Sequence, residues 1–130
     1  MKTSSVAFVV SLFVLTGCVT IRRADNTTSV SETVLVTYHV KPGKEAEFEK
    51  LLKHAWEVYQ LEHLVFADPH VIVKKTGNGN KAECVEIFTW IKSPDNPPDD
   101  VKVIWQQEQS LCEARDGQRG IKIEEVEIVK

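Results

Sequence analysis

The chain has 130 residues, of which 42% are hydrophobic and 27% charged, a composition that suits one globular domain and excludes disorder over most of its length. Its 16 basic and 19 acidic residues give a net charge of -3 and are interspersed along the sequence. No basic patch results, so we expect no nucleic-acid partner.

The first 17 residues have the pattern of a secretory signal, because Lys2 precedes an apolar run over residues 6–15. Such a run is too short to span a bilayer, which needs about 20 residues. Residues 15–18, LTGC, resemble the lipobox of bacterial lipoproteins, in which the cysteine is acylated and the preceding peptide removed. The alternative is ordinary signal cleavage with Cys18 nearby by chance.

The lipobox resemblance implies a protein of the bacterial cell envelope that meets the membrane only through a lipid on Cys18. Val19 follows this cysteine in place of the Asp that marks inner-membrane retention, which favours an outer-membrane anchor facing the periplasm. We therefore divide the chain into a lipoprotein signal peptide (1–17), a lipidated cysteine with a flexible tether (18–32) and a folded domain (33–130).

The folded domain begins with a predicted strand over residues 34–40. Leu35, Thr37 and His39 alternate there with the apolar residues Val34, Val36, Tyr38 and Val40. The Pro-Gly pair at 42–43 ends this strand. From Lys44 the apolar residues recur at i, i+3, i+4 and i+7, which predicts an amphipathic helix of about five turns.

Two further strands are predicted at 70–75 and 82–91, joined by the turn sequence GNGN at 77–80. A proline-rich loop then leads to a second helix, whose predicted buried stripe consists of Val101, Ile104, Trp105, Glu108, Leu111 and Cys112. The last strand is predicted at 120–129. The resulting order, β-α-β-β-α-β, predicts an α+β fold of the ferredoxin-like sandwich type.

A sheet of this type carries its helices on one face, so its other face must be covered by something else. We predict that Leu35, Thr37, Phe88 and Trp90 lie on that second face. This much apolar surface is rarely left in water, and packing of two sheets face to face in a homodimer covers it.

The pattern VxYxVKPGKxxxFxxLL over residues 36–52 resembles the opening of the antibiotic biosynthesis monooxygenase-like domain, a dimeric α/β barrel. Trp90, followed by Ser93 before the second predicted helix, is similar to a recurrent tryptophan of that family. The resemblance is strongest over 34–52, and the order of elements extends it to residue 130. It implies the barrel fold and a homodimer, but relatives differ in chemistry, so it does not fix the activity.

The haem-degrading branch of that family is similar in its tryptophan but has an Asn on the first strand and a haem-ligating His on the second helix. Here the first strand offers Thr37 and His39, and residues 101–115 contain no His. The resemblance therefore does not extend to haem degradation.

A cofactor-independent oxygenase needs an apolar pocket for an electron-rich substrate, a base, and polar groups that steady the resulting anion. We predict that His39, Glu86 and Trp90 carry this chemistry on a small aromatic or apolar molecule. Leu35, Thr37 and Phe88 would then contact the ligand. The alternatives are a non-catalytic binder and a structural dimer, with His39 at the rim, Glu86 paired or exposed, and Trp90 in the core or interface.

No metal or other cofactor is predicted, because the four histidines, at 39, 54, 63 and 70, lack the spacing of metal ligands. Two cysteines remain beside Cys18. Cys84 and Cys112 are compatible with a disulfide in an oxidising envelope, but we favour two buried free thiols.

Overall fold

The computed structural model describes residues 31–77, 79 and 81–130. The predicted signal peptide, the lipidation of Cys18 and all but the last two residues of the tether lie outside these residues. The elements in chain order are β1 (Glu32–Val40), α1 (Glu45–Leu61), β2 (Val65–Thr76), β3 (Ala82–Trp90), α2 (Asp99–Leu111) and β4 (Ile121–Glu125).

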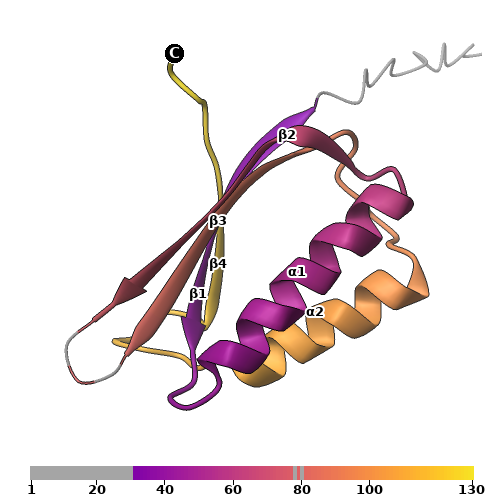
Figure 1. The fold of residues 1–130 in the computed structure, drawn as a ribbon. Coiled ribbons are helices and arrows are strands. Elements are labelled where there is room, and N and C mark those ends of the chain that lie inside the picture. Colours follow the sequence, from indigo (N-terminus) through magenta and orange to yellow (C-terminus); the bar gives the residue numbers. More distant parts are fainter. Residues whose placement is uncertain (1–30, 78, 80) are drawn as a thin grey trace, which may run out of the picture.

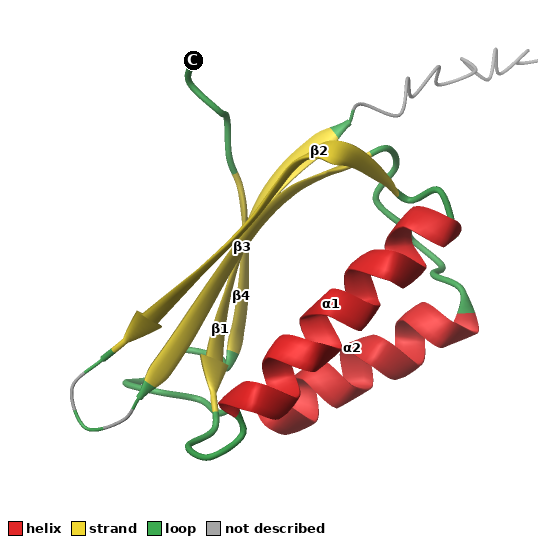
Figure 2. Ribbon diagram, viewed as in Figure 1, coloured by secondary structure: helices red, strands yellow, loops and turns green. Residues whose placement is uncertain are grey.

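The four strands form one antiparallel sheet in the order β2-β3-β1-β4. Both helices lie on the same face of this sheet, as Figures 1 and 2 show. The predicted α+β class is confirmed, and the arrangement is compatible with a ferredoxin-like fold. None of the described residues forms a helix on the opposite face of the sheet.

The helices form where the sequence pattern predicts them. Gly43, at φ +80, makes the turn that ends β1, and Glu45 and Glu47 occupy the first turn of α1, where the helix dipole favours acidic side chains. The residues that α1 buries are Phe48, Leu52, Ala55, Val58 and Tyr59. Those that α2 buries are Val101, Ile104, Glu108 and Leu111.

The strand boundaries differ from prediction chiefly at β2 and β4. β2 begins at Val65, because pairing with Trp90 of β3 continues through a register shift between Val65 and His70. Pro69 is tolerated there because β2 is an edge strand and needs fewer ladder donors. β4 ends at Glu125, which pairs with Val34 close to the start of β1. One more backbone hydrogen bond follows, from the N–H of Val126 to the carbonyl of Thr33. The C-terminal segment then leaves the sheet (Figure 1).

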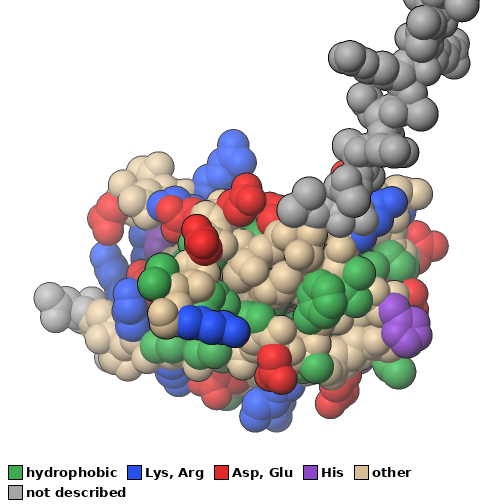
Figure 3. Space-filling view, turned by 90° about the horizontal axis from the view of Figure 1, so that it is seen from above, with side chains coloured by type: hydrophobic (Ala, Val, Ile, Leu, Met, Phe, Trp, Pro, Cys, Tyr) green, Lys and Arg blue, Asp and Glu red, His purple; other side chains and the backbone are tan. Residues whose placement is uncertain are grey.

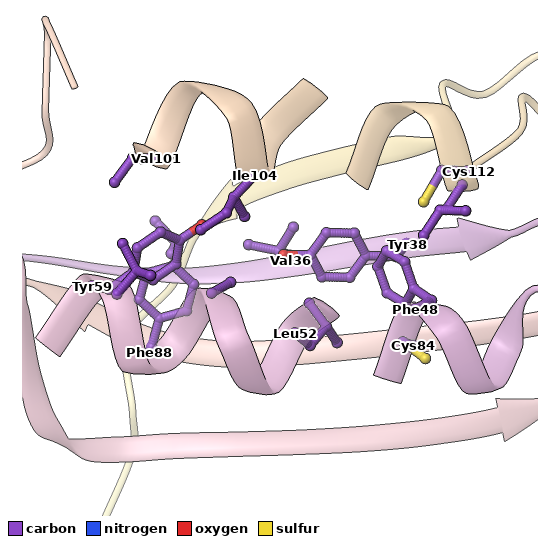
Figure 4. Packing of buried hydrophobic residues seen from close by; sticks show 14 of the residues in the cluster. Val36, Tyr38, Phe48, Leu52, Tyr59, Cys84, Phe88, Val101, Ile104 and Cys112 are labelled. Carbon is purple, nitrogen blue, oxygen red and sulfur yellow. The ribbon is translucent and has the colours of Figure 1, made fainter. Parts of the chain in front are cut away.

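The hydrophobic core fills the layer between the sheet and the helices. Figure 4 shows Tyr59 and Phe88 packed together at one end of this layer, and Tyr38 with Phe48 at the other. Trp56 is only half-buried and packs against the edge of the core. Val34, Val36 and Tyr38 of β1 therefore point to the helices, which defines the inner face of the sheet.

The molecular surface seen in Figure 3 carries acidic, basic and apolar side chains side by side. Figure 3 shows hydrophobic side chains interspersed with acidic and basic ones on the view from above. Among the described helices, none is both long and apolar enough to cross a membrane.

Candidate functional site: an apolar cavity on the inner face of the sheet

A cavity of about 240 Å³ lies between the inner face of the sheet and the two helices. The residues that line it are Val34, Val36, Tyr38, Tyr59, Phe88, Trp90, Trp105, Glu108, Gln109, Ile121 and Ile123. Every element except β2 contributes to this lining. The short β4, which ends at Glu125, leaves Ile121 half-buried and Ile123 exposed at its rim.

Aromatic rings form much of the cavity wall. The ring centroid of Trp90 lies 4.8 Å from that of Phe88, 5.3 Å from that of Tyr59 and 6.4 Å from that of Trp105. The indole N–H of Trp105 donates to the hydroxyl of Tyr59 over 2.7 Å, which ties α2 to α1. The wall is therefore apolar and held by edge contacts between rings.

Glu108 is the one charged side chain among the described residues of this lining. It lies on the buried stripe of α2 and is only 4% exposed, and its Oε1 atom has no hydrogen-bond partner among the described residues. Burial, with a contribution from the charge of Glu86, raises the pKa of Glu108 to about 8. The cavity thus contains a carboxyl group that is mostly protonated at neutral pH, half-protonated only near pH 8, and free to bond a ligand.

A second buried carboxyl group, Glu86 on β3, lies behind the cavity wall. Tyr38, which lines the cavity, donates its hydroxyl to Glu86 Oε2 over 3.0 Å. His70 Nε2 lies 3.0 Å from Glu86 Oε1. Burial and the charge of Glu86 raise the pKa of Tyr38 well above its ordinary value, so its hydroxyl remains a donor.

The ring of Trp56, which belongs to α1, stacks on His70. The two rings stack with centroids 3.6 Å apart and planes inclined by only 9°. Glu86 is 2% exposed while the side chain of His70 is 20% exposed. The chain Tyr38–Glu86–His70 therefore runs from the cavity to the edge of the sheet at β2.

The structure separates the three residues predicted to share a catalytic cavity. Glu86 and Trp90 lie on the inner face of β3, whereas His39 lies on the outer face of β1 and faces Glu83 across the strand pair. Of these three residues, only Trp90 lines the cavity. Glu86 is connected to the cavity by the hydrogen bond that it accepts from Tyr38. We correct the expected constellation accordingly, because a sheet lies between His39 and the other two residues.

His39 belongs to a different environment at the end of β1. Its Nε2 lies 3.7 Å from Glu83 Oε2, and its Nδ1 has no partner among the described residues. The loop after α2 covers it, since Glu113 donates its backbone N–H to the carbonyl of His39. Arg115 in that loop donates to the backbone carbonyls of Ala82 and Val40, which fixes the loop against the sheet.

The residues predicted to contact a ligand are likewise divided between the two faces of the sheet. Leu35 and Thr37 lie on the outer face, as expected, while Phe88 and Trp90 lie on the inner face, contrary to expectation. The reason is the register of the β1–β3 pair, in which Phe88 lies opposite Val34, a residue covered by the helices.

Both cysteines of the described domain are free thiols, Cys84 on β3 and Cys112 just after α2. Burial raises the pKa of Cys112 to about 12 and also raises that of Cys84. Such thiols are poor nucleophiles. Within the described ranges, no three His, Cys, Asp or Glu side chains are grouped to hold a metal ion.

Sequence reasoning placed Glu108 on a buried stripe but assigned it no role. An acidic residue at such a position is a usable signal, because a buried carboxyl group needs a partner or a raised pKa. The contact of His70 with Glu86 had no such signal, since it depends on the register of β2.

Comparison of the chain with protein-family models, with curated proteins and with solved structures found no match in any of the three.

Proposed function

We propose that this domain binds a small apolar or aromatic molecule in the cavity on the inner face of its sheet. The observation that carries this proposal is the pairing of an aromatic wall with one unpartnered, buried carboxyl group, Glu108. Ligand sites are concave and mostly apolar, with a few polar groups that fix orientation. A volume of about 240 Å³ lies below the usual range for drug-sized ligands, so the ligand is small.

Phenol is a suitable first probe, because its ring matches the aromatic wall and its hydroxyl donates to a carboxylate. We expect calorimetric titration to show binding to the native domain and loss of binding in Ile121→Phe, which fills the rim of the cavity. Val103→Phe is the matched control, since Val103 is 51% exposed on α2 and does not line the cavity. Equal phenol binding by all three proteins would contradict the proposed site.

A second candidate function is cofactor-independent oxygenation, which the family resemblance suggests and the raised pKa of Glu108 favours. In this reaction Glu108 removes a proton from an activated CH₂ group of the substrate, and the resulting carbanion reduces dioxygen. One oxygen atom becomes the new carbonyl of the product and the other leaves as water. The apolar wall would hold substrate and dioxygen together.

Oxygen uptake with a panel of anthrone-like and quinol substrates tests this activity. Turnover by the native domain should be lost in Glu108→Gln, which preserves shape but removes the base. It should persist in His39→Ala, because His39 lies on the outer face of the sheet. Turnover that depends on His39 and not on Glu108 would contradict this assignment.

We further propose that the domain is held at the bacterial envelope, facing the periplasm from the outer membrane, by a lipid on Cys18. The support is the LTGC sequence behind an apolar segment. Radioactive palmitate should label the full chain in bacteria and not its Cys18→Ser variant. Equal labelling of the two would refute the anchor.

A homodimer in the manner of a dimeric α/β barrel is the final part of the proposal. Its support is the outer face, which carries no helix within the described part of the chain. On this face Val71, Ile87 and Leu35 form one row across three strands, and Val73, Val85 and Thr37 form the next. Val71 and Val73 are each 46% exposed, and such rows favour sheet-to-sheet packing.

A further inference from the structure

The lining of the cavity has an unusual charge balance. Glu108 is its one ionisable carboxyl group, and among the described residues no Lys, Arg or His lines it. The charge of Glu86 acts on Glu108 from β3, which adds negative potential behind the wall. An anionic ligand would therefore meet repulsion without a compensating cation.

The aromatic wall adds a second attraction for positive charge. The rings of Tyr59, Trp90 and Trp105 all line the cavity. The centroid of Trp90 lies 5.3 Å from that of Tyr59 and 6.4 Å from that of Trp105. The face of an aromatic ring attracts a cation within about 6 Å. Trp and Tyr are the strongest partners of this kind. A carboxylate beside such rings is the combination that recognises ammonium groups.

We propose that the ligand of this cavity is a small organic cation, an amine or quaternary ammonium compound, whose charge is met by Glu108 and by the rings of Trp90, Trp105 and Tyr59. This inference rests on the proposed function and specifies its ligand class. Cation binding gives Oε1 of Glu108 the partner that it lacks among the described residues.

Binding of a cation is coupled to the ionisation of Glu108. Glu86 from β3 contributes to the raised pKa of Glu108, and the charge of Glu108 in turn raises the pKa values of Tyr38 from β1, Tyr59 from α1 and Cys112 beyond the end of α2. Both tyrosines and Cys112 have raised pKa values and stay neutral below pH 9. His70, in contact with Glu86 from β2, is a further titratable group, so the part of any change in cation affinity between pH 6 and pH 8 that belongs to Glu108, for which the pKa is about 8, is the part that Glu108→Gln removes.

Choline and 3,3-dimethylbutan-1-ol form a matched pair of probes, since they have the same shape and only choline carries a fixed positive charge. Calorimetric titration of the native domain at pH 9 should show a preference for choline on the order of tenfold or more. The choline affinity should fall by up to about tenfold per pH unit below pH 8, because protonation of Glu108 must be reversed on binding.

Two variants complete the experiment. Glu108→Gln should lose both the preference and the pH slope, whereas Glu57→Gln, which removes an exposed acid on α1, should keep both. The alcohol binding as tightly as choline would overturn the cation proposal while leaving small-molecule binding in place. Failure of both probes would also overturn it, and only a concurrent failure of phenol would remove the proposed function as well.

Discussion

At the scale of single residues, the domain is unusual in burying two carboxyl groups within one core. Glu86 has two hydrogen-bond partners, Tyr38 and His70, whereas Oε1 of Glu108 has none among the described residues. Burying a carboxyl group without a partner opposes folding. Glu108 therefore reduces the stability of the fold at the position where we propose that a ligand binds.

The raised pKa of Glu108 makes stability depend on pH. Between pH 4.5, its ordinary pKa, and about pH 8, the unfolded chain has lost this proton while the folded chain keeps it. The free energy of unfolding therefore falls as the pH rises through this window, by on the order of 1 kcal/mol per pH unit at most. Urea unfolding at pH 5, 6, 7 and 8 should show a flatter profile in Glu108→Gln, and parallel profiles would contradict the raised pKa.

The bond from Tyr38 to Glu86 makes a separate prediction. Tyr38→Phe removes the donor and leaves one oxygen of a buried carboxyl group without its partner, which should lower the free energy of unfolding by about 1–3 kcal/mol. Thr37→Val, on the outer face of the same strand, should change it far less. Equal effects of the two changes, measured by urea unfolding, would show that the bond contributes little.

At the scale of elements, local sequence signals predicted most of the fold. The alternation of apolar residues predicted that β1 is a strand, and their helical spacing predicted that α1 and α2 are helices. Each of these elements buries one face, so its apolar residues follow the period of its secondary structure. The face of β3 was harder to assign. Its two sides, Val85–Ile87–Thr89 and Cys84–Glu86–Phe88–Trp90, are both partly apolar, so only the register with β1 decides which side meets the helices.

The two partly apolar sides of β3 also explain why the predicted site residues are not grouped as expected. With β3 turned over, Trp90 and His39 would share the outer face. In the structure Trp90 lies instead beside Trp105 on the inner face, where the cavity is. The identity of the site residues was thus partly predictable, while their grouping depended on pairing between distant strands.

The turn between β1 and α1 is the element-scale feature most sensitive to a single change. Gly43 adopts φ +80, which residues with a Cβ rarely do, although no heavy atom lies within 4 Å of where its Cβ would be. Gly43→Ala should therefore cost about 1–2 kcal/mol of unfolding free energy through backbone strain alone. Gly43→Asn should cost less, and an unchanged thermal midpoint for Gly43→Ala would argue against this turn geometry.

At the scale of the whole molecule, the sheet has two faces with different proposed roles. The inner face packs against the helices and holds the cavity. The outer face carries no helix among the described residues, and it holds the apolar rows that we propose to pack in a homodimer. A ligand site on the inner face and a partner on the outer face would then not compete for the same surface.

The dimer proposal is tested by placing a charge in the centre of the outer face. Ile87→Glu should convert a dimer to a monomer at micromolar concentration in light scattering, since a buried unpaired carboxylate opposes association. Val103→Glu, which alters an exposed apolar residue of α2, should remain dimeric. A native domain that is monomeric at this concentration would refute the proposal directly.

We propose that a small molecule enters the cavity on the inner face, and the three tryptophans of the chain can report its binding at this place. Trp90 and Trp105 line the cavity, while Trp56 stacks on His70 outside its lining. During phenol titration of the ¹⁵N-labelled domain, the indole N–H resonances of Trp90 and Trp105 should shift together and saturate, and that of Trp56 should stay in place. Resonances that do not move, or a shift confined to Trp56, would contradict the cavity as the binding site.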